Sequence, residues 1–257
     1  GRNIFRLGYK NPNYNFVAIS DIGSAETLHY LLSRDSIHGA MDDPVHLDGN
    51  HLVVRDQRVR VISGGEPGGI PWDAYNIDCV IDATGKFLKR SELDLHLSAG
   101  AKRVFTTRDP DDDIDRYVIP GVNESSIKAT DKIISTTSST TQVLALMVKM
   151  LDETFGLNRA MMTTVHAYTS DQPLADAVGI DLRRSRSAVE NIIPNSTNAP
   201  SIVEQIMPEF KGKLDGIAFN VPVPNGSCVD LTTELNTMPS VDEANNMVKQ
   251  FTETTLK

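Results

Sequence analysis

Cysteine is scarce in this 257-residue sequence, which contains only Cys79 and Cys228. Two thiols cannot form the disulfide framework of a small secreted domain, and neither has neighbours at metal-ligand spacing. We therefore expect a protein of a reducing compartment, the cytoplasm, with no bound metal. Long apolar runs are also lacking. None approaches the roughly 20 residues that a membrane-spanning helix needs, so no membrane partner is expected.

Basic residues are outnumbered by acidic ones. The sequence has 25 Lys and Arg against 34 Asp and Glu, a formal net charge of −9. A surplus of acid repels phosphate backbones, which argues against nucleic acid as a partner. The residues that are present suffice for a core, because 40 % are hydrophobic and 23 % are charged. The length suits one large domain or two of average size.

Strand and helix patterns alternate along the first half of the chain. Strands are expected at 16–21, 79–83 and 103–107, a hairpin at 52–54 and 59–62, and helices at 3–7, 25–33 and 92–99. This alternation favours a mostly parallel sheet with helices on both faces.

The second half has longer strands and fewer alternations. Helices are expected at 141–155, 199–207 and 242–251, and strands at 161–166, 217–221 and 228–235. Such a pattern favours an α+β domain, and the boundary between the two halves falls near 135–140.

Four segments carry side chains suited to chemistry. Asp21 ends a predicted strand, where it could bind a ribose or be an ordinary turn residue. Hydroxyl side chains fill 135–141, where they could cap the next helix or hold an anion or a nucleophile. His166 could be a general base, although a lone histidine is more often structural. The basic cluster at 181–186 suits phosphate groups or an ion-pair patch between subunits.

Taken in order, these and other segments resemble the phosphorylating glyceraldehyde-3-phosphate dehydrogenases over nearly the whole chain. Many ordered matches at family spacing make the resemblance specific. They are G-R at 1–2, D-S-I-H-G at 35–39, I-P-W at 70–72, A-T-G-K-F at 83–87, G-A-K-R-V at 100–104, G-V-N at 121–123, M-T-T-V-H-A-Y-T at 162–169, N-I-I-P at 191–194 and V-D-L-T at 229–232.

The resemblance implies an α/β protein of two domains. Residues 1–137 would form an NAD-binding domain with a Rossmann-type parallel sheet, and residues 138–257 an α+β catalytic domain with a mixed sheet. The chain is expected to lack both family ends, including the first strand. Family members are homotetramers that oxidise a small-molecule aldehyde to an acyl phosphate, with NAD as cofactor and inorganic phosphate as second substrate.

The resemblance also assigns residues to roles. Ser139 takes the position of the nucleophile, and His166 that of the acid–base residue. The cofactor-binding positions are Gly1, Arg2, Asp21, Ile22, Thr84, Gly85 and Thr107. The two anion sites, for the substrate phosphate and the attacking phosphate, take Ser138, Thr140, Thr169, Asp171, Arg184, Thr197, Asn198 and Asn220. Asp21 repels the 2′-phosphate of NADP and so favours NAD, whereas the run 181–186 is similar to that of photosynthetic members that accept both.

Three site positions depart from the family pattern. Ser139 stands where the family has its cysteine nucleophile, Asn220 replaces an arginine of the substrate-phosphate site, and Asn198 replaces a glycine. A serine hydroxyl is a far weaker nucleophile than a thiolate. Ser139 is either native or introduced, and three hypotheses remain. The chain is such an aldehyde dehydrogenase, a relative with a different aldehyde substrate, or a catalytically silent nucleotide-binding protein.

Overall fold

The computed structural model describes residues 1–179 and 181–254. The chain divides into two compact units. The first comprises Gly1–Arg116 and Ala129–Thr136, and the second Tyr117–Lys128 and Thr137–Lys257. The predicted division between 137 and 138 stays a prediction, and the structure adds that Tyr117–Lys128 packs with the second unit.

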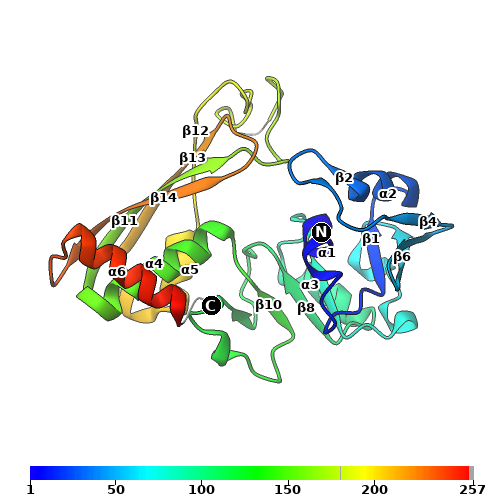
Figure 1. The fold of residues 1–257 in the computed structure, drawn as a ribbon, viewed down its shortest axis with the longest axis horizontal. Coiled ribbons are helices and arrows are strands. Elements are labelled where there is room, and N and C mark those ends of the chain that lie inside the picture. The colour runs from blue at the N-terminus through cyan, green and yellow to red at the C-terminus, as the bar shows by residue number, and fades with distance from the viewer. Residues whose placement is uncertain (180, 255–257) are drawn as a thin grey trace. The chain divides into compact units, whose positions relative to one another are not determined.

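The first unit holds two four-stranded sheets, ordered β1-β6-β5-β4 and β7-β8-β10-β9 (Figure 1). β1 pairs parallel with β6, and β7, β8 and β10 form a parallel set, while β4, β5 and β6 are antiparallel. The elements are α1 (Arg2–Gly8), β1 (Ala18–Asp21), α2 (Ala25–Ser33), β2 (Arg34–Asp35), β3 (Gly39–Ala40), β4 (His46–Asp48), β5 (His51–Val54), β6 (Gln57–Ser63), η1 (Pro67–Gly69), η2 (Trp72–Tyr75), β7 (Cys79–Asp82), α3 (Arg90–Ser98), β8 (Arg103–Thr106), β9 (Arg116–Tyr117) and β10 (Ile133–Ser135).

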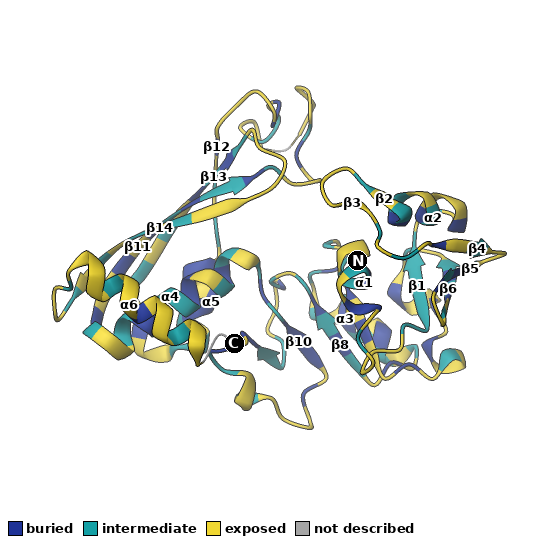
Figure 2. Ribbon diagram, in the orientation of Figure 1, coloured by how far each residue is buried: buried dark blue, intermediate teal, exposed yellow. Residues whose placement is uncertain are grey.

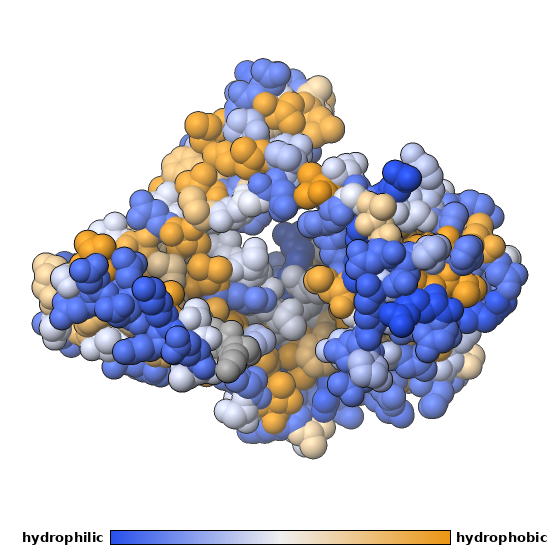
Figure 3. Space-filling model, in the orientation of Figure 1, coloured by the Kyte–Doolittle hydropathy of each residue, from blue (hydrophilic) through white to orange (hydrophobic). Residues whose placement is uncertain are grey.

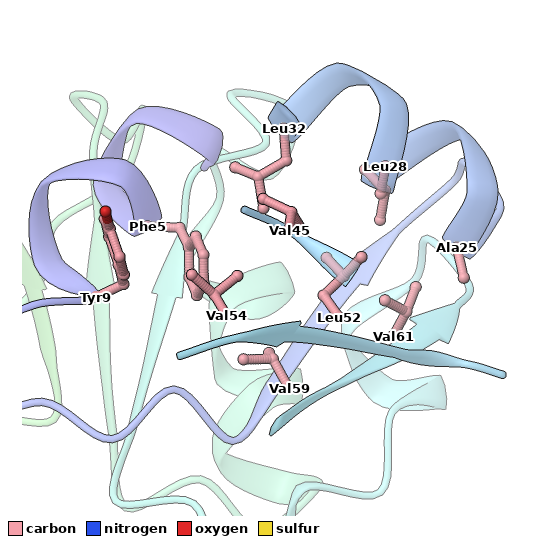
Figure 4. Packing of buried hydrophobic residues seen from close by; sticks show 10 residues of the cluster. All are labelled: Phe5, Tyr9, Ala25, Leu28, Leu32, Val45, Leu52, Val54, Val59 and Val61. Atoms are coloured by element: carbon pink, nitrogen blue, oxygen red, sulfur yellow. The ribbon is translucent and has the colours of Figure 1, made fainter. Parts of the chain in front are cut away.

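Three apolar clusters hold the first unit together, and two of them bear on how its sheets are joined. In one, side chains of α1 and α2 meet those of β5 and β6, as Figure 4 shows for Phe5, Leu28, Leu52 and Val59. In the other, Trp72 and Val80 pack with residues of β1 and β6. The second cluster therefore ties the two sheets to each other, and the carboxyl ends of β1 and β7 become parts of one folded body.

The second unit is a mixed four-stranded sheet, ordered β12-β13-β11-β14, with helices packed on it (Figure 1). The central strand β11 pairs parallel with β13 and antiparallel with β14. The mixed sheet confirms the predicted α+β character. The elements are η3 (Glu124–Ser126), α4 (Ser139–Phe155), β11 (Leu157–Ala167), β12 (Ile193–Asn195), α5 (Ala199–Ile206), η4 (Pro208–Phe210), β13 (Leu214–Val221), β14 (Ser227–Leu235) and α6 (Val241–Glu253).

Alternation along β11 separates the two faces of this sheet. Ala160 and Met162 are buried against Leu144 and Val148 of α4, whereas Met161 is 40 % exposed. The same change from buried to exposed positions is visible along the helices and strands of this unit in Figure 2. One face of the sheet is therefore covered by helices, and the other carries exposed side chains. Within 1–179 and 181–254, no helix is both long and apolar enough to cross a membrane.

Candidate active site

The first group of predicted site residues lies at the carboxyl end of β1. Oδ1 of Asp21 accepts the backbone N–H of Gly23 at 2.8 Å, which fixes the carboxylate at the strand end. Ile22 follows with its side chain 91 % exposed. A Cβ added at Gly65 would lie 3.2 Å from Cγ2 of Ile22, so a side chain at position 65 would crowd it. A carboxylate beside an open apolar surface suits an adenosine, whose ribose needs acceptors and whose base needs an apolar contact.

The second group lies at the carboxyl end of β7, where Asp82 organises two predicted cofactor residues. Oδ1 of Asp82 accepts both the backbone N–H of Thr84 at 2.8 Å and its hydroxyl at 2.7 Å. The main-chain oxygen of Asp82 accepts the N–H of Thr107 at 3.1 Å. Gly85 follows with φ +66°, a left-handed conformation that glycine adopts without strain. The structure therefore brings Thr84, Gly85 and Thr107 together.

The start of α1 adjoins this second group. Gly1 precedes the helix, and Arg2 is its first residue. A Cβ added at Gly1 would lie 3.9 Å from Cβ of Ala83, which directly precedes Thr84. Ligands of parallel α/β sheets bind at the carboxyl ends of the strands. The first unit therefore places all the predicted cofactor residues around strand ends or the start of α1, and their chemistry fits a dinucleotide.

Burial and hydrogen bonding shift the pKa of the Asp82 carboxyl in opposite directions. Burial raises its pKa, but the hydrogen bonds from His96 and Thr84 outweigh this effect and hold the pKa below the ordinary value. Asp82 is therefore a carboxylate near neutral pH, which is the form that accepts all of these donors.

In the second unit, Ser139 is the first residue of α4. Ser138 caps this helix, because its Oγ accepts the N–H of Thr141 at 3.2 Å. The helix was predicted from 141, and its actual start two residues earlier reflects this cap. Ser139 is exposed, and it lies at the helix end where the dipole favours a developing negative charge.

Backbone strain precedes this helix start. Thr137 has φ +62° and is buried, although a β-branched residue rarely adopts a left-handed conformation. Strain of this kind persists where the surrounding structure over-determines it, often at functional sites. The sequence prediction missed this feature, and a threonine alone gives no signal for it.

His166 lies near the carboxyl end of β11, and its ring is held by the backbone. Nδ1 is 2.7 Å from the carbonyl oxygen of Ala167. Since a carbonyl only accepts, Nδ1 carries the proton in this bond, and Nε2 of the neutral ring keeps its lone pair. The histidine is therefore oriented as a base through Nε2.

Helix α4 and strand β11 bring Ser139 and His166 to the same end of the second unit. The 17-residue helix rises about 25 Å, and the chain then turns at Gly156 and enters β11. From Leu157 to His166 the strand advances about 30 Å, back along the helix that packs on it. Figure 1 shows α4 beside β11, against which it packs.

Asn220 is buried beside His166, on the neighbouring strand. The two residues are partners in the parallel register of β11 and β13. Nδ2 of Asn220 donates to the Ala167 carbonyl at 3.3 Å, and Oδ1 accepts from Asn195 at 3.2 Å. Asn220 is only 7 % exposed, so its amide serves the interior, and its role at a phosphate site stays a prediction. Asn195 was not among the predicted site residues.

The remaining predicted anion-site residues lie in three places. Asp171 accepts hydrogen bonds from the Thr169 hydroxyl and from Arg184, with which it forms an ion pair. Thr197 and Asn198 stand separately at the start of α5, where Oγ1 of Thr197 accepts the N–H of Ala199 at 3.2 Å. Thr140 lies in the first turn of α4. Hydroxyls and helix-start N–H groups of this kind suit anions.

Comparison with known proteins gives the same family over the whole chain. Residues 1–90 match the glyceraldehyde 3-phosphate dehydrogenase NAD binding domain, and residues 138–257 match the C-terminal domain of the same enzyme. The chain is 44 % identical over its whole length to glyceraldehyde-3-phosphate dehydrogenase of Priestia megaterium, and 43 % identical to those of Bacillus subtilis (enzyme 1) and Geobacillus stearothermophilus. It spans 77 % of each of these relatives.

These matches confirm the predicted α/β fold, its Rossmann-type NAD-binding domain and NAD as the cofactor. The resemblance seen in the sequence motifs is confirmed by identities above 40 % that extend over the full chain. The chain belongs to the glyceraldehyde-3-phosphate dehydrogenase family.

Proposed function

We propose that this protein is a cytoplasmic enzyme that oxidises glyceraldehyde 3-phosphate to an acyl phosphate, with NAD as cofactor and inorganic phosphate as second substrate. The observation that carries the proposal is the position of Ser139. It begins a capped helix after the strained Thr137, at the end of the unit where His166 presents Nε2. Relatives that match over the full chain bear the name of this activity.

Ser139 and His166 can carry the additions and proton transfers. The Ser139 oxygen adds to the aldehyde carbon, and His166 passes the serine proton to the aldehyde oxygen, which gives a hemiacetal. NAD, when bound, supplies the acceptor for the hydride of that carbon. His166 takes the hemiacetal O–H proton as the ester forms. A phosphate oxygen then attacks the acyl carbon, and the Ser139 oxygen leaves with the proton from His166.

The chemistry of serine makes this route slow. A thiol is partly ionised near neutral pH, whereas a serine hydroxyl depends entirely on its base. An oxyester is also a poorer acyl donor to phosphate than a thioester. We therefore expect the Ser139 chain to form little acyl phosphate from glyceraldehyde 3-phosphate. A spectrophotometric assay of NADH formation with and without phosphate tests the proposal, in this chain and in its Ser139→Cys variant.

A second candidate is a silent nucleotide-binding protein that retains the family fold. Two observations favour it. Ser139 lacks the reactivity of the family cysteine, and Asn220 uses its amide inside the unit instead of offering a charge to substrate. This candidate predicts NAD binding without turnover even after Ser139→Cys, so one variant distinguishes the two.

Asn220→Arg tests the choice of substrate. In the Ser139→Cys background we expect KM for glyceraldehyde 3-phosphate to fall roughly 10- to 150-fold, because a charge-assisted hydrogen bond to the phosphate is gained. Unphosphorylated glyceraldehyde should be almost unaffected. The measurement is kcat/KM for both aldehydes, with Asn and with Arg at position 220, each in the Ser139→Cys variant.

Asn220→Gln is the matched control for this change. It lengthens the side chain and disturbs the bond to Ala167, but it adds no charge. Equal aldehyde preferences in the Arg, Gln and Asn forms would show that position 220 does not contact the substrate phosphate. A different aldehyde substrate would then be the better hypothesis.

We also propose that the chain assembles as a homotetramer through the uncovered face of its second-unit sheet. This face carries the partly exposed Met161 and Ile217, at 40 % and 41 % exposure, on adjacent strands. Apolar residues are visible along these strands in Figure 3. Exposed apolar side chains on a sheet face that no helix covers are suited to an association surface. Light scattering should give the mass of four chains, and Ile217→Lys should give smaller species. A monomeric wild-type protein would contradict the proposal.

A further inference from the structure

A buried polar chain of three side chains lies behind the Thr84–Gly85 turn in the first unit. Nε1 of Trp72, the one tryptophan in the sequence, donates to Nδ1 of His96 at 3.0 Å. Nε2 of His96 is 3.5 Å from Oδ2 of Asp82. Each of the three residues is only 5 % exposed. The reaction described above uses neither Trp72 nor His96.

The hydrogen-bond partners of His96 determine which of its ring nitrogens carries the proton. An indole N–H can only donate, so Nδ1 of His96 accepts and carries no proton. The ring proton is therefore on Nε2, directed at Oδ2 of Asp82. The other carboxylate oxygen receives both donors of Thr84 at 2.7 and 2.8 Å. Every donor points in one direction, toward Asp82 or toward the ring that contacts it.

Asp82 in turn accepts hydrogen bonds from two predicted cofactor residues, Thr84 and Thr107. Its side chain holds Thr84, and its main-chain oxygen holds Thr107 through the N–H at 3.1 Å and the hydroxyl at 3.3 Å. A buried carboxylate that loses one of its partners is costly, and it relaxes by turning toward another donor or toward water. Loss of the His96 contact would therefore move the carboxylate on which Thr84 depends.

We propose that His96, oriented by Trp72, is a positioning residue that holds the Asp82 carboxylate, and through it Thr84, in the arrangement that receives the dinucleotide. The inference rests on the proposed function only in naming NAD as the ligand. The arrangement of the turn itself can be measured without ligand.

Two variants of His96 separate positioning from bulk stability. His96→Leu fills the space but removes both the acceptor for Trp72 and the donor to Asp82. His96→Gln restores one acceptor and one donor, separated much as the two ring nitrogens are. We expect His96→Leu to weaken NAD binding about tenfold and to speed amide exchange at Thr84. His96→Gln should remain within about threefold of the wild type in both.

Calorimetric NAD titration and hydrogen–deuterium exchange at Thr84 are the two readouts, both taken well below the measured Tm of each variant. A lower Tm for His96→Leu with unchanged NAD affinity and unchanged Thr84 exchange would overturn the inference, because the role would then be structural only. If wild-type protein failed to bind NAD, the proposed function would fail, while the Thr84 exchange would still decide the positioning role.

Trp72→Phe serves as the second variant in case His96→Leu does not fold. It keeps an aromatic ring in the core and removes only the N–H that orients His96. We expect a smaller loss of NAD affinity in the same direction, with faster exchange at Thr84. Wild-type NAD affinity and wild-type exchange at Thr84 would overturn the proposed role of the Trp72–His96–Asp82 hydrogen bonds.

Discussion

Replacing Ser139 with cysteine is expected to raise the rate of acyl phosphate formation by at least about 1000-fold, the scale of gain that a competent nucleophile brings to an enzyme. The first turn of α4 favours negative charge, so a thiol there should ionise more readily than an ordinary thiol. In the proposed mechanism His166, whose Nδ1 is hydrogen-bonded to the Ala167 carbonyl, is the base through Nε2. Steady-state assays of NADH formation, with phosphate present and absent, measure the gain.

The matched control places a thiol at another helix start. Ser201→Cys, in the exposed first turn of α5, should leave the rate at the wild-type level. The wild type already contains the exposed thiols of Cys79 and Cys228, so its rate shows what thiols elsewhere contribute. No gain from Ser139→Cys, in a variant that still binds NAD, would refute the enzyme proposal. The silent nucleotide-binding protein would then be the better account.

His166→Asn in the Ser139→Cys background is expected to lower kcat about 100- to 10,000-fold, the usual contribution of a positioned acid–base group. Asparagine can still donate to the Ala167 carbonyl from a position close to that of Nδ1, but it has no counterpart of Nε2. The variant therefore removes the base and keeps the local backbone contact. The affinity for NAD should not change.

The pH dependence of thiol alkylation in the Ser139→Cys variant provides an independent test of the pair. With His166 present, the introduced thiol should react with iodoacetamide below the ordinary cysteine pKa of about 8.5. With asparagine at position 166, the reaction should shift toward that value. Peptide mass spectrometry distinguishes the introduced thiol from the two native ones. Identical profiles in both forms would mean that His166 does not influence residue 139.

Local patterns predicted most of the fold because they reflect burial. The helix expected at 141–155 is α4, and the strand expected at 161–166 is the carboxyl-terminal part of β11. The ends were harder to predict. α4 starts earlier because the Ser138 hydroxyl caps it, and β11 extends to Leu157 because β14 pairs with it along its length. A side-chain cap and a distant partner strand leave little trace in the apolar spacing.

The site was predictable where a motif carries it and unpredictable where distant residues meet. The M-T-T-V-H-A-Y-T motif made His166 a candidate site residue, whose role stays a prediction, but the contact between Asn220 and the Ala167 carbonyl depends on strand register. Likewise, I-P-W was recognised as a family motif without any indication that Trp72 contacts His96. Sequence patterns report which face of an element is buried, and they do not report which polar groups meet inside it.

The most direct test of the central claim is the mass of residue 139 during turnover. The Ser139→Cys protein is mixed with glyceraldehyde 3-phosphate and NAD without phosphate, quenched, digested and analysed by mass spectrometry. The proposed function predicts one acyl group on the peptide that contains position 139, formed together with NADH and lost when phosphate is added. NADH without that adduct, or an acyl group on Cys79 or Cys228 instead, would contradict the assignment of residue 139 as the nucleophile position.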